Sequence, residues 1–440
     1  MIRNEAELTA GADRRQFLKI AVGAGAAVVL SAAPGTAWAA TSVPTGSAPV
    51  EAAASPARTR VYVLVVDGCR PDEITPQLTP RLAELRTQGV NFPAARSLPV
   101  METIPNHVMM MTGVRPDRSG VPANAIYDRA EVVVRDLDRP SDLRFPTVLE
   151  RLREGGLTTG SVLSKEYLFG IFGERATYRW EPSPIVPVSG HAPDQFTMDA
   201  LIAMVTSADP DLVFANFGDI DRVGHSDLTG PTVRAARTTA LALSDAQIGR
   251  FVDHLVTTGI WETSVLIVLA DHSMDWSIPS NVISVDLILR DYPALREQIV
   301  IGQNGGADLL YWVGSDMERA AGLAEVRALV SAHEGVLSVN VPSDLRLGIE
   351  AGDLVAYCRA GWRFSDPMIV SNPIPGNHGH PTTEPIPFFI SGGSPRVRTG
   401  ITLSEPARTV DVAPTVGALF SLAQPSGGYD GTARTAAFTG

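Results

Sequence analysis

Apolar runs that stop at acidic residues are the feature that most constrains how this chain can fold. The run RVYVLVV at 60–66 stops at Asp67, and a second run at 263–270 stops at Asp271. A wholly apolar strand is typical of a parallel sheet that is covered on both faces. A third run, at 210–217, leads into Asp219 and Asp221. The pattern predicts a buried sheet whose strands carry carboxylates at their carboxyl ends.

Helical periodicity alternates with these runs along the chain. The apolar spacing predicts helices at 79–89, 145–156, 193–207 and 240–259. Strands that alternate with helices indicate an α/β fold with a doubly wound, mostly parallel sheet sandwiched by helices. In such folds ligand sites gather at the carboxyl ends of the strands. A chain of 440 residues with 45% hydrophobic content is long enough to bury such a core.

The sequence pattern changes between about 282 and 357. Strand, helix and strand patterns follow one another there, but no strand ends in an acidic residue. This stretch predicts a smaller α+β insertion that covers one side of the site. The sheet pattern then resumes, and 407–423 reads as a closing helix. We therefore expect one catalytic domain over 59–430, with the insertion inside it.

The N-terminus has the three parts of a secretory signal. Arg14 and Arg15 precede a small-residue apolar run that ends in Ala-Trp-Ala at Ala39. The run is shorter than the ~20 residues that a spanning helix needs, and it resembles a twin-arginine signal. We expect 1–39 to direct export through the twin-arginine machinery, with cleavage near Ala39. Residues 40–58, rich in Ala, Ser, Thr and Pro, read as a flexible linker.

The net charge argues against nucleic-acid binding, and the cysteine content decides nothing. A net charge of −12 is a poor match to specific nucleic-acid binding, which calls for a basic face. Cys69 and Cys358 could pair or stay free, because their separation in sequence says nothing about their distance in space.

The segment METIPNHVMMM at 101–111 places polar residues directly before an apolar run. Thr103 or Asn106 could cap a helix that begins here, but one cap does not need both. A threonine at a helix N-terminus is also suited to be a nucleophile, because the positive end of the helix dipole favours the anionic phosphate that it attacks. Thr103 is therefore a candidate nucleophile, and its partners should lie elsewhere in the chain.

Three short motifs supply carboxylates and imidazoles. GDIDRVGH places Asp221 and His225 four residues apart, LADHSM joins Asp271 to His272, and GNHGH contains His378. Residues i and i+4 share one face of a helix, and a strand end brings neighbouring side chains to one point. Carboxylate oxygen and imidazole nitrogen are the ligands that zinc accepts at catalytic sites. Each motif alone is weak, but together they predict a metal centre.

The ordered set VVDG, ETIPNH, DIDRVGH, LADHSM and GNHGH resembles the alkaline phosphatase superfamily, most closely its nucleotide pyrophosphatase/phosphodiesterase branch. The resemblance runs from about residue 60 to 425 and implies two divalent metal ions, with zinc as the expected metal. The segment GVPANAIYD resembles that branch's downstream segment and would bring Asn124 near the substrate. The implied ligands are Asp67, Thr103, Asp271 and His272 for one ion, and Asp221, His225 and His378 for the other.

The resemblance implies hydrolysis of a small-molecule phosphodiester through a covalent phospho-threonine on Thr103. The Asn106 amide is expected to donate to a non-bridging oxygen of the transition state. The chain departs from the branch at Ile104, where nucleotide-binding members carry an aromatic residue. Glu102 either repels highly charged monoester dianions or, as is slightly favoured, faces solvent. His107 is expected to be a packed residue or one that supports a ligand.

Neighbouring chemistries on the same scaffold remain open. A phosphomonoesterase usually needs an added cationic clamp, for which Arg70 and Arg222 are candidates. A phosphonoacetate hydrolase would use a similar metal-bound nucleophile. A sulfatase fits less well, because that group's nucleophile precedes a Pro-Arg pattern that is missing after Thr103. An exported binding protein without catalysis is the alternative from a different class.

Overall fold

The computed structural model describes residues 58–187, 189–228, 234–365 and 374–439. The predicted export signal and all but the last residue of the predicted linker lie outside these ranges. Residues Thr59–Gly440 form one compact unit.

An eight-stranded sheet forms the centre of this unit and confirms the predicted fold class. Its central strands pair in parallel, and β17 is antiparallel to both of its neighbours. Every residue of the central strands β8 and β7 is buried, as wholly apolar strands in a covered sheet require. In sheet order the strands are β18 (Ile401–Thr402), β2 (Val90–Asn91), β17 (Phe388–Ser391), β8 (Ser264–Leu269), β1 (Arg60–Val66), β7 (Leu212–Phe217), β5 (Thr159–Leu163) and β6 (Tyr178–Trp180).

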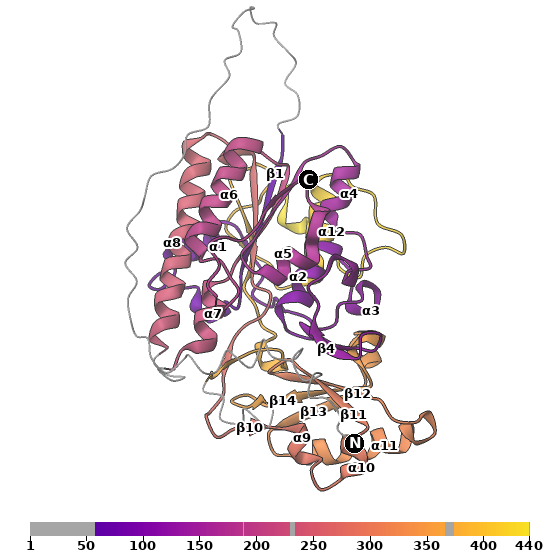
Figure 1. The fold of residues 1–440 in the computed structure, drawn as a ribbon. Helices are drawn as coiled ribbons and strands as arrows, with labels where there is room; N and C mark the ends of the chain where they lie inside the picture. The colour runs from indigo at the N-terminus through magenta and orange to yellow at the C-terminus, as the bar shows by residue number, and fades with distance from the viewer. Residues whose placement is uncertain (1–57, 188, 229–233, 366–373, 440) are drawn as a thin grey trace, which may run out of the picture. The chain divides into compact units, whose positions relative to one another are not determined.

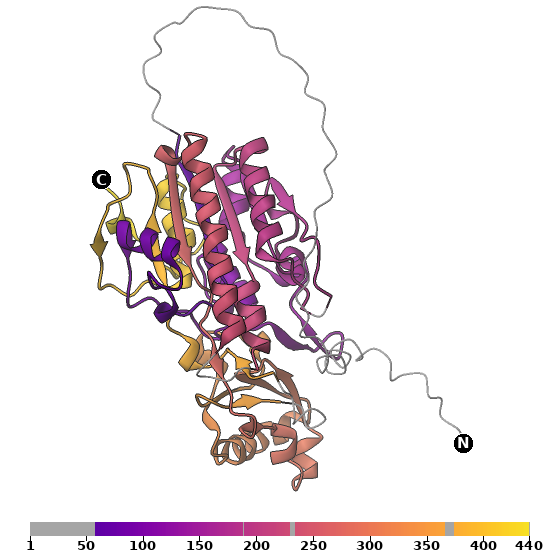
Figure 2. The same ribbon diagram turned by 90° about the vertical axis from the view of Figure 1, so that its left-hand side faces the viewer.

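Helices cover both faces of the sheet, which explains why its central strands are almost wholly apolar (Figures 1 and 2). On one face lie α1 (Pro80–Gln88), α6 (Asp194–Ala208), α7 (Asp219–Ser226) and α8 (Ala235–Thr257), with α8 packed against the other three. On the other lie α2 (Thr103–Thr112), α4 (Val148–Glu154), α5 (Glu166–Phe172) and α12 (Val412–Leu419), with the short α3 (Pro116–Ser119) beside α2.

The insertion builds a second, smaller core on its own antiparallel sheet. Its four strands run in the order β11 (Ile299–Gln303), β12 (Ala307–Trp312), β14 (Leu354–Cys358) and β13 (Val336–Asn340). Its helices are α9 (Val285–Ile288), α10 (Pro293–Arg296) and α11 (Asp316–Ser331). Short pairs connect it to the rest: β3 (Ala125–Asp128) with β4 (Val133–Asp136), β9 (Asp275–Trp276) with β16 (Gly376–Asn377), and β10 (Val282–Ile283) with β15 (Arg363–Phe364).

Strand register places the acidic strand ends side by side. Val65 of β1 pairs with Leu269 of β8 and with Asn216 of β7, and Asn216 pairs in turn with Leu163 of β5. Four neighbouring strands therefore end at the same level of the sheet. The residues that follow them meet at one edge, where the candidate site lies.

Candidate active site

The first group of side chains lies at the ends of the two central strands. Asp67 follows β1, and Asp271 and His272 follow β8; their ligand atoms lie within 4.8 Å of one another. We call these three residues the Asp67 group. Thr103, the first residue of α2, brings its hydroxyl oxygen to 3.2 Å from His272 Nε2. The predicted nucleophile thus meets the group at a helix N-terminus, where the dipole favours an anion.

The second group joins a helix to a distant loop. Asp221 and His225 lie one turn apart on α7, and His378 completes a set whose ligand atoms also lie within 4.8 Å of one another. We call these three the Asp221 group. The segment before His378 passes so close to α7 that position 376 requires glycine, because a Cβ at Gly376 would stand 2.3 Å from the carbonyl oxygen of Gly224. The two groups adjoin, since the His272 and His378 rings stack with centroids 3.7 Å apart.

Backbone carbonyls fix the orientation of all three imidazoles. The Nδ1 atoms of His225, His272 and His378 lie 2.8, 2.9 and 3.2 Å from the carbonyl oxygens of Gly376, Ser273 and Met101. A proton on Nδ1 donates to each carbonyl and leaves Nε2 as the free lone pair that a metal needs. Burial lowers the pKa of His272 to about 4 and holds the pKa of His378 well below its usual value. Both rings are therefore neutral at pH 7, which is the ligating form.

Unpartnered carboxylate oxygens test whether these residues fit metal ions. Oδ1 of Asp67, Oδ1 of Asp221 and Oδ2 of Asp271 are buried and accept no hydrogen bond. These same atoms face the imidazole Nε2 atoms, at 3.3 Å for Asp221 to His225 and 3.4 Å for Asp271 to His272. A buried carboxylate oxygen without a partner is costly unless a cation satisfies it. The donor set, neutral imidazole and carboxylate, fits zinc or a similar divalent ion in each group.

Lys165 connects the two groups, and sequence reasoning missed it. Its Nζ lies 2.8 Å from Asp67 Oδ2 and 2.7 Å from Asp221 Oδ2, and its side chain is fully buried. Burial alone would raise the pKa of Asp221, but Lys165 and then His225 hold it well below the usual value. Burial and then Asp271 raise the pKa of Asp67, against the attraction of Lys165. Lys165 thus bonds to Oδ2 of one carboxylate in each group, Asp67 and Asp221, and leaves Oδ1 of both for a metal.

Asn216 supports the same arrangement from β7. Its side-chain amide donates to Asp67 Oδ2 at 2.7 Å and lies 2.9 Å from His107 Nε2, while its oxygen accepts from Ser164. His107 is fully buried, as expected, and its Nδ1 lies 2.8 Å from the carbonyl oxygen of Thr103. Position at the carboxyl end of a buried strand is the signal that could have found Asn216 and Lys165.

Asn106 corrects the sequence prediction. Its amide nitrogen donates to the carbonyl oxygens of Leu98, Val100 and Glu102 at 3.0 to 3.2 Å. Its amide oxygen accepts from the Leu98 backbone and from Thr409. A fully buried amide with these partners has no donor left for a transition state, so the predicted role is wrong. Asn106 instead holds the segment that leads into the nucleophile.

Asn124 lies beside Ile104, the residue that follows the predicted nucleophile Thr103. Its side-chain oxygen accepts from the backbone N–H of Ile104 at 2.8 Å. Its amide nitrogen has no acceptor among the described residues. The prediction for Glu102 is wrong: the side chain is buried rather than solvent-facing, and its Oε2 accepts from the Asn124 backbone N–H at 2.7 Å. Desolvated Glu102 therefore helps to fix Asn124.

Several other candidates lie outside the two groups. His380, the second histidine of the GNHGH motif, pairs through Nε2 with Asp275 at 3.2 Å. Cys69 and Cys358 are both free and buried. Burial raises the pKa of both thiols, so neither is a thiolate at neutral pH.

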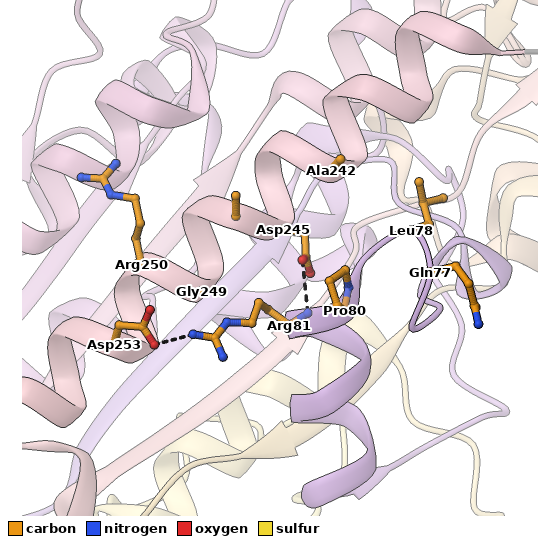
Figure 3. A pocket seen from close by; sticks show the side chains of 10 residues that line it. Gln77, Leu78, Pro80, Arg81, Ala242, Asp245, Gly249, Arg250 and Asp253 are labelled. Carbon is orange, nitrogen blue, oxygen red and sulfur yellow. Dashed lines mark hydrogen bonds and ion pairs between the residues drawn. The ribbon is translucent and has the colours of Figure 1, made fainter.

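A surface pocket between α1 and α8 is a different feature (Figure 3). Its charged residues are already engaged: Asp245 accepts from the Arg81 backbone, and Asp253 pairs with the Arg81 guanidinium. Neither metal-binding group contributes to its lining.

Comparison with known proteins decides the family. The family model described as type I phosphodiesterase / nucleotide pyrophosphatase matches residues 61–380, the stretch that contains both groups. The chain belongs to this family. The resemblance noted in the sequence is thereby confirmed, and the chain takes its place among phosphodiesterase and pyrophosphatase hydrolases.

Relatives of this phosphodiesterase family member are distant in sequence. Human ectonucleotide pyrophosphatase/phosphodiesterase family member 5 is 23% identical over 368 residues, covering 77% of this chain and 70% of that protein. Bovine bis(5'-adenosyl)-triphosphatase ENPP4 is 24% identical over 240 residues, or 52% of this chain and 50% of that protein. The chain thus spans about half the length of the bovine relative.

Solved structures confirm the fold. The murine family member 5 matches with a TM-score of 0.72 at 19% identity, covering 87% of this chain and 100% of that chain. A second structure of the murine protein is an inactive threonine-to-alanine variant in complex with AMP, with the same TM-score. At this identity the likeness shows the shared α/β architecture.

Within the described ranges, no helix combines the length and apolar character needed to cross a bilayer.

Proposed function

We propose that this protein is an exported, two-metal phosphodiesterase that cleaves small-molecule phosphodiesters through a covalent phospho-threonine intermediate on Thr103. The observation that carries the proposal is the position of the Thr103 hydroxyl at the start of α2, 3.2 Å from His272 Nε2 and beside buried carboxylate oxygens that lack partners. The murine relative that is inactive after a threonine-to-alanine change supports a threonine nucleophile in this family.

Each group would hold one divalent ion, with zinc the best match to the donors. Asp67, Asp271, His272 and Thr103 would bind one, and Asp221, His225 and His378 the other. When bound, such ions lower the pKa of a coordinated hydroxyl or water and offset charge on the phosphoryl oxygens.

The chain's own residues then divide the reaction into two steps. In the first, Thr103 Oγ1 attacks phosphorus, a bond from oxygen to phosphorus forms, and the bond to the leaving alcohol breaks. In the second, water attacks the phospho-threonine and releases Thr103 with the phosphomonoester. The helix N-terminus favours negative charge at this point throughout.

Asn124 is the residue that we assign to substrate binding. Its oxygen is held by the Ile104 backbone, which directs its amide nitrogen away from that contact and leaves two N–H groups for a non-bridging phosphoryl oxygen. A positioned donor of this kind is typically worth ~3 kcal/mol in the transition state.

The test is hydrolysis of bis-p-nitrophenyl phosphate and of p-nitrophenyl phosphate by zinc-loaded mature protein and by Thr103→Ala. We expect preference for the diester and a loss of about 10³-fold or more in the variant, with metal content largely kept because the carboxylate and imidazole ligands remain. Preference for the monoester would indicate a phosphatase. Turnover of neither substrate would contradict the proposal, and phosphonoacetate would be tried next.

Export through the twin-arginine machinery is a separate part of the proposal. It rests on Arg14, Arg15 and the small-residue site that ends at Ala39. Replacing both arginines by lysine should retain the uncleaved protein inside the cell, as judged by fractionation and by the mass of the product.

A further inference from the structure

Two arginines follow candidate metal ligands closely in sequence, and they differ in how their donors are used. Arg70, three residues after Asp67, donates to both oxygens of Asp72 and to the Met274 carbonyl. Its guanidinium is therefore satisfied within the protein. Arg222, directly after Asp221, makes no ion pair in the part of the chain that the structure describes, although Asp221, Asp67 and Asp136 attract its charge from a longer distance.

Arg222 instead rests on an aromatic ring. Its guanidinium carbon lies 5.5 Å from the centroid of Tyr167, and Nη2 donates to the Tyr167 hydroxyl at 3.2 Å. The Nε atom is buried and has no acceptor. A guanidinium carries five N–H donors, so most of those on Arg222 remain unused. A desolvated donor without an acceptor is costly, which points to an acceptor that a ligand supplies.

Tyr167 adds to the same set of donors. Its hydroxyl accepts from Arg222, but no acceptor for its own hydrogen is found among the described residues. Burial raises the pKa of Tyr167, so it is a neutral phenol that can donate. Two cations contact its ring, because Lys165 Nζ lies 5.9 Å and the Arg222 guanidinium carbon 5.5 Å from the ring centroid.

This arrangement lies next to the metal-binding groups. Lys165 bonds directly to Asp67 and Asp221, and Arg222 is the chain neighbour of Asp221. Unused donors on a cation suit an oxyanion, either phosphate or carboxylate, which guanidinium binds well.

We propose that Arg222 and Tyr167 form an anion subsite beside the metal-binding groups, which takes a second anionic group of the substrate in addition to the reacting phosphoryl. The inference rests on the proposed function and deepens it. It assigns the substrate to phosphodiesters or phosphoanhydrides that carry a further phosphate or carboxylate.

The experiment uses two chromogenic diesters with the same leaving group, propyl p-nitrophenyl phosphate and 2-carboxyethyl p-nitrophenyl phosphate. They differ by one carboxylate. The zinc-loaded wild-type protein should prefer the carboxylate ester by about tenfold or more in kcat/KM, the effect of one charge-assisted hydrogen bond. Arg222→Met should bring the ratio close to one, mainly through KM, and Tyr167→Phe should lower it several-fold.

Arg70→Met is the matched control, because it removes an equally near arginine whose donors are already satisfied. The ratio should stay at the wild-type value in that variant. Tyr167→Phe removes a single hydroxyl and keeps the inference testable if Arg222→Met does not fold. An equal preference in wild type and Arg222→Met, or no preference in wild type, would overturn the subsite.

Failure of the proposed function gives a different result. If the wild-type protein hydrolyses neither ester, the phosphodiesterase proposal fails. Calorimetric titration with inorganic pyrophosphate then tests the subsite alone. At least tenfold weaker binding to Arg222→Met than to Arg70→Met would support it, and equal binding would overturn it.

Discussion

The Asp67 group and the Asp221 group offer similar ligands from different parts of the fold. Asp67, Asp271 and His272 follow the two central strands of the sheet, and all three are 0% exposed. The Asp221 group joins the eight-residue helix α7 to a loop beyond the insertion, and the His225 side chain is 26% exposed. Rigid strand ends suit the ion that orients a nucleophile, whereas a partly exposed group suits the side where water and leaving group exchange.

Removing one ligand from each group tests the difference between the Asp67 group and the Asp221 group most directly. Asp271→Asn should lower kcat/KM by about 10³-fold, and His225→Ala by about 10²-fold at saturating zinc, because a partly exposed ligand is more easily replaced by water. Activity against free zinc concentration, with metal content by mass spectrometry, measures both. The reverse order of effects would contradict the distinction.

Lys165→Met tests whether one cation serves both groups. In the metal-free protein the change leaves buried carboxylates unpaired and should cost about 3 kcal/mol or more of unfolding free energy. Bound divalent ions compensate the same carboxylates, so the zinc-loaded protein should lose less.

Thermal unfolding with and without zinc measures this difference. Arg434→Met is a matched control, because Arg434 is a buried cation that pairs with Asp411 rather than with either group. It should destabilise both forms equally. A similar result for Lys165→Met would show that Lys165 has no special relation to the metals.

The pH dependence of the metal-free protein probes its buried imidazoles, of which His272 belongs to the Asp67 group and His378 to the Asp221 group. Burial lowers the pKa of His272 to about 4, against an ordinary value near 6.5. Between these values the unfolded chain binds the proton and the folded protein does not, so stability falls as pH falls from about 6.5 to 4, by about 3 kcal/mol in all.

Denaturant unfolding at several pH values should therefore show a steeper dependence for wild type than for His272→Asn, both without metal. Equal slopes would mean that His272 is protonated in the folded protein.

The smallest effect is expected at His380. His380→Gln removes the pairing with Asp275 but touches neither group, so metal content should be unchanged and activity should fall less than threefold, as for most changes outside a site. Loss of one metal equivalent, measured by mass spectrometry, would show that His380 is the metal ligand in place of His378.

Much of this architecture follows from local sequence pattern. A strand that is apolar throughout must be covered on both faces, so β1, β7 and β8 were predictable, and the acidic residues after them marked the reactive edge. Asp221 and His225 were also predictable as partners, because i and i+4 share a helix face. These inferences use the order of residues along one segment only.

Contacts between distant segments were not accessible in this way. Lys165 follows a buried strand, which marks its place at the edge of the sheet, but only the alignment of β5 with β7 and β1 places its Nζ between two carboxylates. The local sequence around Asn106 is the same whether its amide faces a substrate or three carbonyl groups. Only tertiary packing directs the amide to the carbonyls.

The order of residues thus indicates which side chains can carry the chemistry and at which edge of the sheet they gather. The tertiary structure alone decided which polar groups are already satisfied and which remain unpartnered, as with Arg70 and Arg222. The physical reason is that hydrogen bonding and desolvation depend on three-dimensional neighbours, which no spacing along the chain specifies.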